Sequence, residues 1–251
     1  ELLRLLAEGR LTPEQAIQLA HILESGALGE TQSASAEPPA AAEEGASVQQ
    51  ASVSEAEFDA IARQTYREAF ASLSRHPDAQ VRIAVAQMSQ PNTRQAAMQT
   101  LWSHAQNNPD DPLRDEIYLL CGSVGEANND PLGQRALDVA ANVSANDPAV
   151  WRMLSRSYGR ADRASEARGA ALVSEAVQAQ AEGQTDAAEQ RLREALPNLT
   201  APTLRAPVVS NLGQIAEVRN DWTSASARCA EAYRLREETA RQSPLRAAAE
   251  Q

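Results

Sequence analysis

The chain has 251 residues and a formal charge of −11, from 34 acidic residues against 23 basic ones, all of them Arg. Ala fills 50 positions while aromatic residues make up only 4%, a composition that favours closely packed helices over a β-rich core. The absence of any apolar run of about 18 residues excludes a membrane span, and the acidic balance argues against a nucleic-acid binder, whose footprint would be basic.

Residues 1–29 are predicted to form a short helical hairpin. The leucines of its first helix lie on one face, and this helix ends at Gly9. The second helix begins with a capping box formed by Thr12 and Gln15, with Pro13 between them at the first helical position. The segment LLAEGRLTPEQA resembles the hairpins of SHOCT-like segments, which attach to other domains and mediate assembly. The resemblance implies a docking or assembly contact, because two short helices bury too little surface to be stable alone.

Residues 30–53 are rich in Ala, Ser, Glu and Pro and are predicted to be a disordered acidic linker. Residues 1–57 hold 10 acids and 2 Arg, which leaves the rest of the chain nearly neutral at −3. The next helix is predicted to begin at Ser54, with Glu57 completing a second capping box, and to end before His76. The linker would let the hairpin act as a second contact beside the domain that follows.

From about residue 78 to 240 the sequence shows a degenerate internal repeat. In its best unit, NLGQIAEVRNDWTSASARCAEAY, a turn at Asn220-Asp221 joins two helices. Small residues at Ala225 and Cys229 allow close helix packing, and Tyr233 is predicted to fill the space beside them. The unit resembles a tetratricopeptide repeat.

Weaker copies of the unit precede it at uneven spacing. The step of 21 residues between Ala167 and Ala188, against 34 in a regular array, predicts one long helix over about 163–182 that two overlapping units share. The resemblance implies an all-α fold, a right-handed α-solenoid of repeats over residues 54–240, followed by a tail at 241–251.

A candidate binding surface lies on the helix after Asp147-Pro148. Arg152, Arg156 and Arg160 step by four residues and line one face of it. Arginine forks bind carboxylates, so this ladder is suited to an acidic peptide. In tetratricopeptide domains that clamp a C-terminal carboxylate, basic and Asn residues occupy such positions, and the resemblance implies that Asn211 contributes as well. The alternative is a solvated Arg face neutralised by Glu on neighbouring helices.

An apolar groove is the second option. Val173 and Val177 would lie beside Val208 and Val209 and accept an amphipathic helix of a partner. The alternative places these valines in the core, because every repeat must bury the inner faces of its helices.

No catalytic, cofactor or metal site is predicted. The histidines are far apart in sequence and show no metal-binding spacing, and His76 is interpreted as a helix cap and His104 as a neighbour of a turn. The pair Asp110-Asp111 is interpreted as favouring a helix dipole rather than holding a cation. The two glycines of CGSVGE at 121–126 lack the Lys of a phosphate-binding loop.

We therefore expect a non-enzymatic adaptor or scaffold in a bacterial cytoplasm, with Cys121 and Cys229 as small, buried, unpaired residues. Its partner is a protein that presents an acidic peptide or an amphipathic helix, and the hairpin provides an assembly contact, either for a homo-oligomer or for the chain's own groove. Two alternatives stay open: a regulatory domain of a larger signalling or secretion-type complex, and a helical-repeat enzyme.

Overall fold

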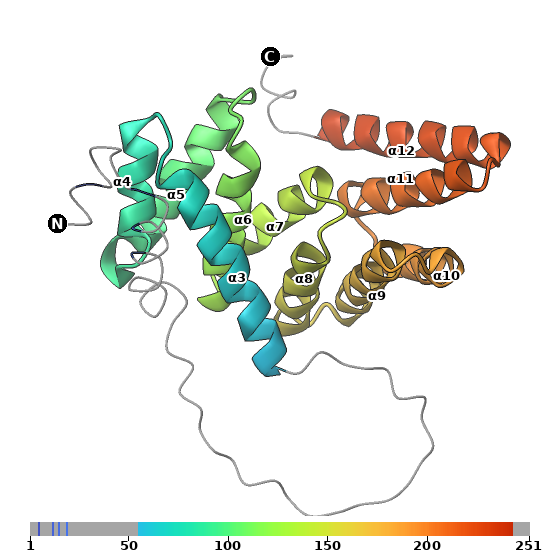
Figure 1. Ribbon diagram of the computed structural model, residues 1–251, viewed down its shortest axis with the longest axis horizontal. Coiled ribbons are helices and arrows are strands. Elements are labelled where there is room, and N and C mark those ends of the chain that lie inside the picture. The colour runs from blue at the N-terminus through green and yellow to red at the C-terminus, as the bar shows by residue number, and fades with distance from the viewer. Residues whose placement is uncertain (1–4, 6–11, 13–14, 16–18, 20–54, 243–251) are drawn as a thin grey trace, which may run out of the picture.

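The computed structural model describes residues 55–242 together with Leu5, Thr12, Gln15 and Leu19. In these residues every regular element is a helix (Figure 1), which confirms the all-α prediction. None of the described helices is long and apolar enough to cross a membrane. The predicted linker at 30–53, the capping residue Ser54 and nearly all of the tail lie outside the described residues. The helices are α3 (Glu55–Leu73), α4 (Ala79–Gln87), α5 (Pro91–Asn107), α6 (Arg114–Ala127), α7 (Pro131–Val143), α8 (Pro148–Arg160), α9 (Ala164–Ala181), α10 (Thr185–Ala195), the 3-10 turn η1 (Leu196–Asn198), α11 (Pro202–Val218) and α12 (Trp222–Gln242).

Four helix–helix turns in the described chain share one geometry. Asn129, Asp162, Gly183 and Asn220 each adopt a left-handed φ between 54° and 77°. The residue after each one donates its backbone N–H to the carbonyl five residues back. This bond satisfies a free carbonyl at the helix end and reverses the chain, as in a Schellman motif. It forms the hairpins α6–α7, α8–α9, α9–α10 and α11–α12, and it confirms the predicted turn at Asn220-Asp221.

The helices α4, α7 and α8 each begin after an aspartate that caps their free N–H groups. The carboxylates of Asp78, Asp130 and Asp147 accept the backbone N–H groups two residues on at 2.7–2.8 Å. Asp130 and Asp147 each precede a proline at the first helical position, where the missing N–H costs nothing. The predicted helix after Asp147-Pro148 is confirmed as α8.

The long helix α9 packs against both α8 and α10. Its observed span, Ala164–Ala181, confirms the prediction of one long helix over about 163–182. The array is not a strictly linear stack, because α11 also contacts α7, and α3 lies across α6 and α8 (Figure 1). In an open solenoid each repeat would contact only its neighbours.

The helices α6 and α7 approach each other closely at two glycines. A methyl group on Gly125 would lie 2.3 Å from the Cα of Gly133, and one on Gly122 would lie 2.6 Å from the side chain of Leu137. The two glycines of the CGSVGE segment are therefore packing residues, since any side chain at Gly125 would collide with the backbone of α7.

The core runs through the whole array and includes the N-terminal segment. Its largest fully buried side chains include Trp151, Tyr118 and Phe70, and Leu19 of the predicted hairpin is buried in the same cluster. The predicted capping box is confirmed: Thr12 N–H donates to Gln15 Oε1 at 3.0 Å, and Gln15 N–H donates to Thr12 Oγ1 at 3.3 Å.

Two packing predictions on α12 are wrong. Tyr233 does not fill an interhelical space but is 68% exposed, and Cys229 is exposed as well. The reason is that α12 packs chiefly against α11, so its covered flank carries Ala225 and Ala232. Cys229 lies at the edge of this flank, with Sγ 3.8 Å from the position of a methyl group on Gly213. Cys121 is buried as predicted, and both cysteines are free.

Candidate functional site

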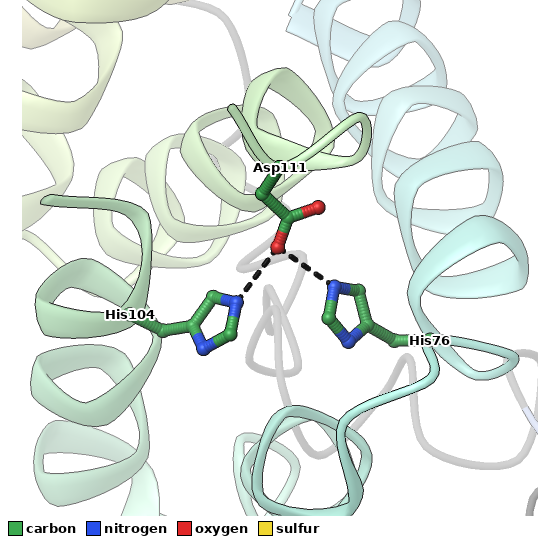
Figure 2. Close-up of side chains that lie close together, drawn as sticks. All are labelled: His76, His104 and Asp111. Atoms are coloured by element: carbon green, nitrogen blue, oxygen red, sulfur yellow. Dashed lines mark hydrogen bonds and ion pairs between the residues drawn. The ribbon is translucent and has the colours of Figure 1, made fainter. Parts of the chain in front are cut away.

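Three polar side chains from separate segments converge between α3, α5 and α6 (Figure 2). His76 lies in the loop after α3, His104 in the last turn of α5, and Asp111 in the loop before α6. The Nε2 atoms of the two histidines lie 2.9 Å and 2.7 Å from the same oxygen of Asp111, Oδ2. We call these three residues the His–Asp cluster.

The cluster is largely shielded from water and well supported. The side chains of His76 and Asp111 are only 3% and 7% exposed. The second oxygen of Asp111, Oδ1, accepts the backbone N–H of Leu113 at 2.9 Å. Burial raises the pKa of Asp111, but the N–H of Leu113 and the hydrogen bonds from His104 and His76 outweigh it, so this pKa lies below its ordinary value.

Asp78 supports both imidazoles from the other side. Its backbone N–H donates to Nδ1 of His76 at 3.0 Å, so the proton of neutral His76 is on Nε2 and is donated to Asp111. The carboxylate oxygen Oδ2 of Asp78 lies 3.6 Å from Nδ1 of His104. The two rings meet edge to face, with centroids 5.2 Å apart.

A pocket of about 380 Å³ opens beside the cluster. All three residues of the cluster line this pocket. The lining residues are His76, Pro77, His104, Asn107, Asn108, Pro109, Asp110, Asp111 and Pro112.

Sequence reasoning missed this cluster. The side chain of His76 does not cap a helix but reaches Asp111, which lies 35 residues away in the chain. The carboxylate of Asp111 does more than interact with the dipole of a helix, because it accepts hydrogen bonds from two imidazoles. The spacing of these residues in the sequence does not indicate a cluster, because each residue comes from a different segment.

The arginine ladder points largely into the protein. Nε of Arg156 lies 3.4 Å and Nη1 of Arg160 lies 2.8 Å from one carboxylate oxygen of Glu126, whose side chain is only 2% exposed. Arg160 also donates to the main-chain carbonyl of Glu126 at the end of α6. Arg152 donates to the side-chain oxygen of Gln178 on α9. Two of the three arginines therefore pair with a Glu of a neighbouring helix, as the alternative interpretation expected. That interpretation also expected a solvated face, whereas Glu126 is buried.

The other residues expected in a groove are buried. Val173 and Val177 on α9 belong to the core, and so do Val208 and Val209 on α11. Asn211 is 1% exposed and offers no surface to a ligand. The interpretation of the four valines as core residues describes this structure.

An exposed apolar strip lies instead on the flank of the α11–α12 hairpin. Trp222 and Tyr233 on α12 are 66% and 68% exposed, and Val218 at the end of α11 is 72% exposed. At about 100° per residue, positions 222, 229 and 233 fall within about 40° of one another around the helix. Cys229 therefore shares this flank and lies between the two aromatics along the helix axis. We call Val218, Trp222, Cys229 and Tyr233 the α12 strip.

No protein family matches the chain, and neither a curated protein nor a solved structure matches it. Its function is therefore inferred from the geometry of its own residues.

Proposed function

We propose that the chain is a non-enzymatic adaptor or scaffold that binds an amphipathic helix of a partner protein along the α12 strip. The observation that carries this proposal is the exposure of Trp222 and Tyr233, two aromatic side chains, on one flank of a single helix. Monomeric proteins rarely leave aligned aromatics in water, and Trp and Tyr dominate the binding energy of protein interfaces.

The shape of the strip favours a helix as the bound element. Trp222 and Tyr233 are 11 positions apart, which is about 16 Å along α12. A partner helix with apolar residues at i, i+4, i+7 and i+11 covers this distance. In a helical-repeat array each hairpin packs its flank against the next one. The bound helix would take the place of that next hairpin.

The charges around the strip support an apolar contact over a carboxylate clamp. Arg228 pairs with Glu231 at 3.0 Å and Arg241 with Glu237 at 2.7 Å, both within α12. Of the other two arginines of α12, Arg234 donates to the carbonyl of Ala230 and Arg236 to the hydroxyl of Ser210. The helix as a whole carries a net charge of +1, from four arginines and three glutamates. Of the two partners expected from the sequence, the amphipathic helix is therefore favoured, since Glu126 already occupies Arg156 and Arg160.

We further propose that the hairpins are tetratricopeptide-like repeats of a right-handed array. Support comes from the starts of α6 and α8, at Arg114 and Pro148, which lie 34 residues apart, the period of that repeat. A regulatory domain of a larger complex would use the same strip. The adaptor role is the proposal to which we commit.

The test uses a phage library of amphipathic helical peptides selected on the full chain. Trp222 is the most exposed of the three tryptophans, so binding should shift its fluorescence to shorter wavelength. The double substitution Trp222→Ser/Tyr233→Ser should weaken the selected peptides at least about 30-fold, as loss of a hot spot does. Ile83→Ser, which removes an exposed apolar residue on α4, is the matched control and should leave affinity unchanged.

Two outcomes would contradict the proposal. The first is that selected peptides bind the double variant as tightly as the parent chain, which would place their site elsewhere. The second is that sedimentation shows a dimer that the double substitution dissociates. In that case a second copy of the chain, rather than a partner helix, covers the strip.

A further inference from the structure

We infer that His76, His104 and Asp111 bind a divalent transition-metal ion of the zinc class. Two imidazoles and one carboxylate are a donor set that suits zinc, and three protein ligands with one open position form a known type of zinc site. This site is independent of the α12 strip and goes beyond the proposed adaptor role.

The donor atoms already lie close to ligand positions. All three fall within 4.8 Å of one another, and both Nε2 atoms converge on the same carboxylate oxygen (Figure 2). Ligands about 2.0–2.1 Å from a tetrahedral zinc ion are about 3.3 Å apart. The observed separations of 2.9 Å and 2.7 Å therefore need to widen by only about half an ångström, which side-chain rotation supplies without moving a helix.

Groups behind the ligands hold two of them in metal-binding orientation. The Asp78 carboxylate faces Nδ1 of His104 at 3.6 Å. When a metal ion replaces the Nε2 proton that His104 donates to Asp111, the proton on Nδ1 lies toward this carboxylate. A carboxylate behind a ligating imidazole is the usual second partner in zinc sites. The N–H of Leu113 holds Oδ1 of Asp111, so Oδ2 is the free ligand atom.

His76 is the weak member of the set. Its Nδ1 accepts the backbone N–H of Asp78, whereas a metal on Nε2 requires the proton to be on Nδ1. Binding therefore gives up this hydrogen bond and leaves two N–H donors without an acceptor, the backbone N–H of Asp78 and Nδ1–H of His76, which lowers affinity roughly a hundredfold. Structural zinc sites in peptides bind with constants on the order of 10⁷ M⁻¹ or more, so the penalty reduces the affinity to roughly micromolar rather than abolishing it.

The fourth coordination position faces the pocket. Its volume of about 380 Å³ admits water or a small donor ligand. The three ligands come from the loop after α3, the last turn of α5 and the loop before α6. A bound ion would therefore also cross-link these three helices. Metal binding is therefore expected to stabilise the folded chain, since the unfolded chain does not hold the three ligands together.

The experiment titrates the full chain, first stripped with a chelator, with zinc chloride and with cobalt chloride at pH 7. We expect one ion per chain by calorimetry, a dissociation constant on the order of micromolar, visible absorption of tetrahedral cobalt, and a raised melting temperature. Magnesium and calcium should have no effect, because they prefer all-oxygen sites. Zinc should shift the ring signals of His76 and His104 in the NMR spectrum of the unaltered chain.

The variants Asp111→Asn and His104→Gln should each weaken zinc binding at least about 30-fold, a loss of one ligand. Asp110→Asn is the matched control, because Asp110 is the exposed neighbour in the same pocket, and it should bind zinc within about threefold of the parent. Circular dichroism without metal checks that each variant folds, and the NMR readout on the unaltered chain needs no variant.

Three results would overturn the inference. The first is that the unaltered chain binds no zinc below about 100 µM, far weaker than such a site allows. The second is that Asp110→Asn loses as much affinity as Asp111→Asn, which would indicate diffuse binding to the acidic surface. The third is that zinc binds with no change in the signals of His76 and His104.

Discussion

The contact between Gly125 and Gly133 provides a direct test of how α6 and α7 pack. In the variant Gly133→Ala the new methyl group would lie 2.4 Å from the Cα of Gly125, 2.5 Å from its carbonyl carbon and 2.7 Å from the N of Glu126. Carbon atoms in contact prefer about 3.5–4.0 Å. All three neighbours are backbone atoms, so the two helices must separate by about an ångström.

The cost follows from this separation. Overpacking a close-packed core costs about 1–3 kcal/mol, and more when backbone must move. We expect the upper end, about 3–4 kcal/mol, offset by about 1 kcal/mol from the better helix propensity of Ala. The net loss of about 2–3 kcal/mol is a large share of the 5–15 kcal/mol that stabilise a typical domain. Urea unfolding followed by far-ultraviolet circular dichroism measures it.

Gly159→Ala is the matched control. Gly159 lies in α8 with nothing within 4 Å of its added methyl group, so the same substitution should stabilise by up to about 1 kcal/mol. The two variants should therefore differ by about 3–4 kcal/mol. Equal free energies of unfolding for the two variants would refute the contact between α6 and α7 at their glycines.

Two further predictions concern titration and reactivity. The pKa of Asp111 is lowered in the fold, so its contribution to stability should be complete above the ordinary value of 3.8 and disappear as pH falls through the lower, folded value. Urea titrations of the chain and of Asp111→Asn from pH 7 to pH 3 should converge at the acidic end, and a constant difference would contradict this. A disulfide reagent at pH 8 should react rapidly with one thiol only, Cys229, because burial raises the pKa of Cys121 to about 12; rapid modification of both would mean that α6 is not packed as described.

Local signals along the chain predicted helices and turns well. The Asp147-Pro148 start, the Thr12–Gln15 capping box and the Asn220 turn each depend on residues within a few positions. Their physics is local as well: a carboxylate or hydroxyl caps free N–H groups, proline fixes φ, and Asn tolerates the left-handed region. The long helix α9 was predictable because the spacing of small residues reports helix contacts.

Exposure was harder to predict than helix position. The spacing of Ala225, Cys229 and Tyr233 shows which residues share a helix, but the pattern alone places all three in packing positions. In the structure Ala225 faces α11 while Tyr233 lies in water. The flank that a helix buries depends on its neighbours, and among the described helices α12 packs chiefly against α11.

The sequence by itself determined the helical class, the hairpin turns and the long helix, because these depend on backbone preferences and on contacts close in the chain. Only the tertiary structure decided which charged and ligating groups meet. It placed His76 beside Asp111, 35 residues away, and directed Arg156 and Arg160 onto the buried carboxylate of Glu126. Helical periodicity shows that side chains share a face, but only packing shows which charged or ligating group lies opposite that face.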